Sequence, residues 1–101
     1  MKGLSRKAKI LLELLSDKPI DKATLKSMLN VEERTVRKYV DELRLRGIRV
    51  ASNSQTKGYW LGDEADIAHT IADYRSRAMK DLAIADALEK GEDIGQEEID
   101  L

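Results

Sequence analysis

Residues 29–48 read LNVEERTVRKYVDELRLRGI, and this stretch decides the fold. Within it Val36, Val40 and Leu43 recur at helical spacing, which predicts an amphipathic helix with a single buried stripe. Gly47 follows the periodic segment and can adopt the left-handed conformation that ends many helices. The stretch therefore predicts a helix that packs on one side, is polar on the other, and stops at a defined residue.

Two starting points fit this helix. Asn30 together with Glu33 would form a variant of the capping box. A start at Glu32 uses a poorer N-cap residue, but Val31 and Val36 are then spaced as a hydrophobic staple. The residues leave both alternatives open.

Two shorter helices are predicted upstream. The first begins at a Ser5 N-cap and ends before Pro19, and the second begins at an Asp21 N-cap and runs to about Leu29. The apolar positions of the first are Ala8, Leu11, Leu12 and Leu15. Both helices therefore have one apolar side that can pack against the helix of residues 29–48.

A β-hairpin is predicted downstream. Residues 48–51 and 58–61 alternate with period two around a polar loop at residues 52–57. The side chains expected to face the core are Ile48, Val50, Tyr59 and Leu61. Trp60 points to the opposite face of the pleat, where we expect it to pack beneath the helix that follows.

The order of these elements is that of a winged helix-turn-helix domain. Residues 29–44, closed by Arg46-Gly47-Ile48 and then by Gly58-Tyr59-Trp60-Leu61, resemble the bacterial winged-helix domains of the DeoR and biotin-repressor type. They are similar in particular to small winged-helix proteins of phages of Gram-positive bacteria, over residues 4–61. The resemblance implies an α+β fold of three helices and a hairpin wing that binds double-stranded DNA. Glu32 departs from the pattern, because the family usually has Ser or Thr there.

Candidate DNA contacts follow from the polar side of the third helix. Its outward positions carry Arg34, Arg37 and Lys38, and Arg or Lys bonding to guanine is the commonest base contact in the major groove. The resemblance implies that these three contact bases or adjacent phosphates and that Thr35 contacts phosphate. We expect four further residues to contact the DNA backbone and so position the protein on it. They are Lys22 and Lys26 on the second helix and Ser54 and Lys57 in the wing loop.

The charges divide the chain into a basic and an acidic part. Residues 1–61 carry 14 Lys or Arg and 7 Asp or Glu, a net charge of +7, whereas residues 62–101 carry 4 and 12, a net charge of −8. A basic first part suggests a polyanionic partner. We therefore predict a DNA-binding domain at residues 1–62, a self-association helix at residues 63–90, and a mobile acidic tail at residues 91–101.

The last helix has an apolar seam with an average spacing of 3.5 residues, the period of a coiled coil. The seam consists of Ile67, Ile71, Tyr74, Ala78, Leu82, Ala85 and Leu88. A second apolar face is built mainly of alanines, among them Ala65 and Ala68. We expect the winged domain to cover one face and a second copy of the helix to cover the other.

Several classes of protein are disfavoured by the residues that are missing. The chain has no Cys, and its single His, His69, lies off the seam, where we expect it to be exposed. No glycine-rich phosphate loop or nucleophile motif is present, so we expect no enzyme, no cofactor and no metal site. With no membrane-spanning apolar run, we expect a cytoplasmic protein.

The favoured interpretation is a small dimeric transcriptional regulator, encoded by a phage or prophage, with activation and repression both open. The alternative is a winged-helix adaptor in replication or assembly, which would grip a protein partner through Trp60 and the acidic helix.

Overall fold

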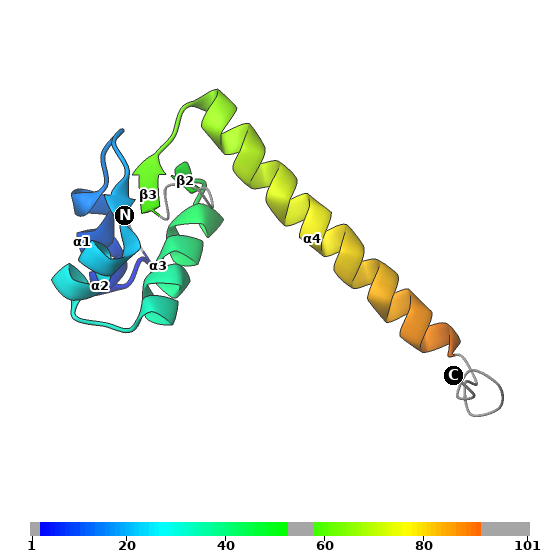
Figure 1. Cartoon of the computed structure of the whole chain (residues 1–101). Helices are drawn as coiled ribbons and strands as arrows, with labels where there is room; N and C mark the ends of the chain where they lie inside the picture. The colour runs from blue at the N-terminus through cyan, green and yellow to red at the C-terminus, as the bar shows by residue number, and fades with distance from the viewer. Residues whose placement is uncertain (1–2, 53–57, 92–101) are drawn as a thin grey trace. The chain divides into compact units, whose positions relative to one another are not determined.

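The computed structural model describes residues 3–52 and 58–91. Its elements are α1 (Arg6–Leu14), β1 (Ile20–Asp21), α2 (Lys22–Leu29), α3 (Glu33–Leu45), β2 (Val50–Ser52), β3 (Gly58–Leu61) and α4 (Glu64–Lys90) (Figure 1). Three helices and a small antiparallel sheet are followed by one long helix, which confirms the predicted fold class. None of the helices described is both long enough and apolar enough to cross a membrane.

Contacts along the chain define two units, Met1–Thr70 and Ile71–Leu101. The first unit therefore includes the beginning of α4 as well as the winged domain. The predicted tail at residues 91–101 lies outside the described residues except for Gly91. The predicted domain division at residues 62 and 90 stays a prediction.

The core of the first unit lies where α1, α2 and α3 meet. Each helix contributes its apolar stripe, and Leu11, Leu25, Val40 and Leu43 are completely buried. Val50 of β2 joins them from the sheet. The polar sides of the helices are consequently left at the surface, which is what places the candidate DNA contacts there.

The predicted caps of the first two helices are confirmed. The hydroxyl of Ser5 accepts a hydrogen bond from the amide of Ala8 at 3.3 Å, and the carboxylate of Asp21 accepts one from the amide of Ala23 at 3.4 Å. Ser5 also donates to the carboxylate of Glu42 on α3, at 2.9 Å from its hydroxyl. The start of α1 is thereby attached to the third helix.

Of the two starts considered for α3, the one at Glu32 is correct. Glu32 is the N-cap residue, and its side chain makes no capping hydrogen bond. Asn30 ends α2 instead, in the left-handed conformation with φ of 56°, and its amide donates to the carbonyl of Ser27 at 3.2 Å. A residue that closes one helix in this conformation cannot also cap the next.

The end of α3 is the Schellman motif expected for Gly47. Gly47 has a φ of 84°, its amide donates to the carbonyl of Arg44 at 2.9 Å, and the amide of Ile48 donates to the carbonyl of Leu43 at 3.1 Å. Because Ile48 completes this motif, β2 begins later than predicted, at Val50.

The sheet has three strands in the order β1-β3-β2, whereas the sequence predicted a hairpin alone. In the additional pairing Ile20 lies opposite Tyr59 and Asp21 lies opposite Gly58. A Cβ atom at Gly58 would lie 2.6 Å from the carbonyl oxygen of Ile20, so the close approach requires glycine there. The short β1 strand thus joins the start of α2 to the base of the wing.

Both faces of the wing base are buried, as the predicted packing of Trp60 beneath the following helix implied. Val50 and Tyr59 are buried as expected, but Ala51 and Trp60 on the other face are buried as well. At the start of α4, Asp66 accepts a hydrogen bond from the indole N–H of Trp60 at 3.0 Å. The N-cap of α4 is Asp63, whose carboxylate accepts from the amide of Asp66 at 2.9 Å.

Candidate nucleic-acid interface

The exposed side of α3 presents three cations. Arg34, Arg37 and Lys38 are all exposed, while Thr35 beside them is half-buried. They lie outward because Val36, Val40 and Leu43 turn the other side of the helix into the core. The structure therefore brings together the four residues predicted for base and phosphate contact on this helix.

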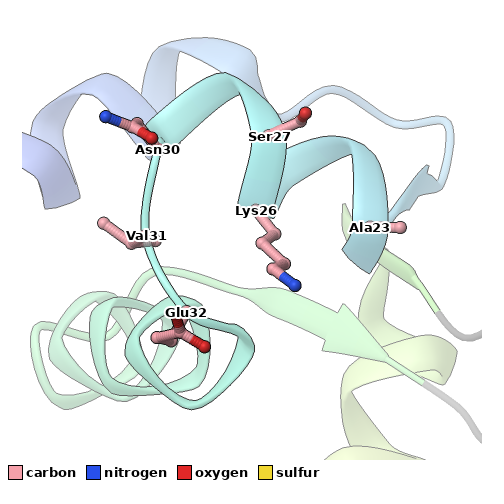
Figure 2. Close-up of a pocket in the computed structure, with 6 residues that line it drawn as sticks. All are labelled: Ala23, Lys26, Ser27, Asn30, Val31 and Glu32. Atoms are coloured by element: carbon pink, nitrogen blue, oxygen red, sulfur yellow. The ribbon is translucent and has the colours of Figure 1, made fainter.

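A hollow of about 450 Å³ lies at the turn between α2 and α3. Figure 2 shows its six lining residues, Ala23, Lys26, Ser27, Asn30, Val31 and Glu32. Lys26 comes from α2, and Glu32 lies across the hollow at the start of α3. A phosphate entering here would meet one cation and one carboxylate, so the gain from Lys26 is opposed by Glu32.

Three cations meet at the ring of Tyr59 on β3. The ammonium of Lys22 lies 5.5 Å from the ring centroid and the guanidinium of Arg44 lies 6.0 Å from it. The guanidinium of Arg37 is near enough for its charge to act on the phenol. Burial raises the pKa of Tyr59, although the charges of Arg44 and Arg37 act in the opposite direction, so the phenol is neutral at physiological pH.

Arg44 connects the third helix to the wing. Its Nε donates to the carbonyl of Val50 at 2.8 Å, and its terminal nitrogen donates to the hydroxyl of Ser52 at 3.0 Å. This role was not predicted from the sequence, although a signal was present: Arg44 follows Val40 by four residues and so lies beside the buried stripe. A cation placed there faces the hairpin rather than solvent.

The winged domain described above matches a known protein family. A family model described as an HTH domain matches residues 6–60, more than half of the chain. The chain belongs to the HTH domain family. This is a winged helix-turn-helix family typical of DeoR-like and biotin-repressor-like regulators, and such a domain implies DNA as a partner. No match was found among curated proteins or among solved structures.

Trp60 lies at the end of the matched HTH domain and anchors α4. Its indole N–H donates to the carboxylate of Asp66 at 3.0 Å, and 9% of the residue is exposed. Packing against the following helix is therefore confirmed. The adaptor alternative used both Trp60 and the acidic helix for contact with a protein partner, and Trp60 is buried within the chain.

Two predicted wing contacts of the HTH domain, Ser54 and Lys57, lie outside the described residues. Lys22 is half-buried against Tyr59, whereas Lys26 is exposed. Among the residues that the structure describes, no group of three or more His, Asp or Glu side chains could hold a metal ion.

The predicted self-association seam runs along α4, which follows the matched residues 6–60 in the chain. Ile67 is half-buried, and Ile71, Tyr74, Ala78, Leu82, Ala85 and Leu88 are exposed. His69 is exposed, as predicted. Ala65 and Ala68 are exposed too, so at these positions the winged domain does not provide the cover that we expected for the second apolar face.

Proposed function

We propose that this protein binds double-stranded DNA sequence-specifically, as a small transcriptional regulator that acts as a dimer. The observation that supports it is the third helix of an HTH domain with Arg34, Arg37 and Lys38 exposed opposite a buried stripe. A helix that enters the major groove needs donors on its outer side, and these cations supply them.

The three cations differ in where they lie on the exposed side of α3. Arg37 lies beside the wing, close enough for its charge to act on the phenol of Tyr59. Arg34 and Lys38 are one turn apart and lie along the same exposed side. We assign base recognition chiefly to Arg37, and base or phosphate contact to Arg34 and Lys38.

The acidic second part of the chain limits where DNA can bind. Residues 62–101 carry a net charge of −8, which repels a phosphate backbone and restricts DNA contact to the basic first part. As the resemblance implies, we further propose action without a cofactor and a phage or prophage source.

A binding selection from random duplexes, repeated at low and high salt, tests the proposal. We expect one recovered sequence motif with an affinity that falls steeply as salt rises. Recovery of no motif, with weak retention of every duplex, would contradict sequence-specific regulation.

Arg37→Ala is the sharper test. Loss of one bidentate base contact costs about 1–3 kcal/mol and relaxes the preference at one base position. Arg6→Ala, which removes the same charge from an exposed position on α1, is the matched control and should leave the base preference unchanged. Equal weakening on all sequences would reassign Arg37 to the phosphates.

A further inference from the structure

The second unit carries an apolar stripe on α4. Ile71, Tyr74, Ala78, Leu82 and Ala85 fall within an arc of about 80° on a helix of 3.6 residues per turn. Exposed fractions are 43% for Ile71, 41% for Tyr74 and 64% for Leu82. Each of these side chains gains free energy when a partner removes it from water, and a contiguous exposed stripe of this kind marks an interaction surface.

We propose that residues 71–85 pair with the same residues of a second copy in the antiparallel direction, with Ala78 at the two-fold axis. The inference deepens the dimer of the proposed function by fixing its helix direction. It does not depend on DNA binding.

The sizes of the side chains favour this direction. In the antiparallel pair Ala78 meets the partner's Ala78, Tyr74 meets the partner's Leu82, and Ile71 meets the partner's Ala85. Every large side chain then has a defined neighbour, and the two alanines let the helices approach closely at the axis. A parallel pair would instead place alanine against alanine at both Ala78 and Ala85. The interface would then be loosely packed at these two positions and crowded where two large side chains meet.

The charges beside the stripe select the same direction. Arg75 and Asp86 flank it on one side, and Arg77 and Asp81 flank it on the other. The guanidinium of Arg77 lies 4.9 Å from the ring centroid of Tyr74, which places it at the border of the stripe.

In an antiparallel pair, the residues on one side of the stripe face the residues on the same side of the partner's stripe. In a parallel pair, they face the residues on the opposite side of the partner's stripe. Antiparallel packing places the partner's Asp81 and the partner's Arg77 each about 3 Å along the axis from Arg77, a separation of two residues. The dimer therefore gains two Arg77–Asp81 attractions against one Arg77–Arg77 repulsion. Antiparallel packing also brings Arg75 within about 8 Å along the axis of the partner's Asp86. Parallel packing would set Arg75 beside the partner's Arg77, and flanking charges of this kind determine helix orientation.

Disulfide cross-linking of the full chain tests the direction, since the sequence contains no Cys that could interfere. Ile71→Cys and Ala85→Cys are prepared separately, one with a mass tag, then mixed and equilibrated with oxidised and reduced glutathione. The oxidised glutathione accepts the two electrons released when two thiols join. We expect a mixed disulfide between the two variants and little cross-linking of either alone.

The opposite pattern would overturn the proposal: each variant cross-linked to itself indicates parallel helices. Ile84→Cys lies away from the stripe and is the control, which should remain uncross-linked. The reaction contains no DNA, so its result is separate from the test of DNA binding.

Sedimentation tests the pairing itself. Wild type should sediment as a dimer and Leu82→Glu as a monomer with unchanged helix content, because a carboxylate in the stripe would have to be buried unpaired. Leu82 is 64% exposed in the single chain, so the substitution should not unfold it. A wild-type monomer at high micromolar concentration would overturn the proposal.

Discussion

Replacing Arg44 by alanine should destabilise the winged domain far more than an ordinary surface substitution does. The guanidinium donates to the carbonyl of Val50 at 2.8 Å and to the hydroxyl of Ser52 at 3.0 Å, and it lies 6.0 Å from the ring centroid of Tyr59. Val50 is completely buried, so water does not easily replace the donor at its carbonyl.

The magnitude follows from these contacts. A hydrogen bond from a charged donor contributes about 1.5–3 kcal/mol, and a partly solvated contact with an aromatic ring adds about 0.5–1 kcal/mol. Ser52 can turn its hydroxyl toward water, so the second hydrogen bond adds little. We expect Arg44→Ala to lower the free energy of unfolding by about 2–4 kcal/mol, and Tm by roughly 8–30 °C for a domain of this size.

Urea unfolding measures this change, with the fluorescence of Trp60, the only tryptophan of the chain, as the signal. Arg49→Ala removes an exposed arginine from the adjoining turn and should change the free energy by about 0.5 kcal/mol or less. Arg44→Lys keeps the charge without the forked donors, so it should fall between the two. A loss below about 0.5 kcal/mol for Arg44→Ala would refute the view that Arg44 ties the wing to α3.

Two further outcomes are expected. The pKa of Asp66 is lowered, chiefly by the indole N–H of Trp60 and by the amide of Asp63, so folding favours the carboxylate. Its contribution to stability is therefore present above the ordinary pKa near 3.8 and is lost as pH falls through the lower folded-state value. Asp66→Asn should consequently flatten the acid limb of a stability profile, and an unchanged limb would contradict this origin. Deleting residues 92–101, which carry five acids and no bases, should strengthen non-specific DNA binding most at low salt, as measured by fluorescence anisotropy. Weaker binding of the truncated chain at every salt concentration would point to a structural role for that segment.

The features that the sequence determined by itself depend on residues close together in the chain. Ser5 and Asp21 cap helices because a side-chain oxygen can reach an amide two or three residues away in any tertiary setting. Gly47 ends α3 for a similarly local reason, its freedom to adopt positive φ. The helical spacing of Val36 and Val40 likewise fixed which side of α3 is buried, and hence which cations are exposed.

Only the tertiary structure decided the contacts between distant segments. No local pattern required Ile20 to pair with Tyr59, and the pairing exists because the packed helices bring β1 beside β3. Arg44 reaches the carbonyl of Val50 only once the Schellman turn has reversed the chain. The start of α3 was undecided in the sequence for the same reason, since Asn30 could serve either helix. The structure assigns Asn30 to the end of α2, because the turn between the helices needs a left-handed residue there to bring both apolar stripes into one core.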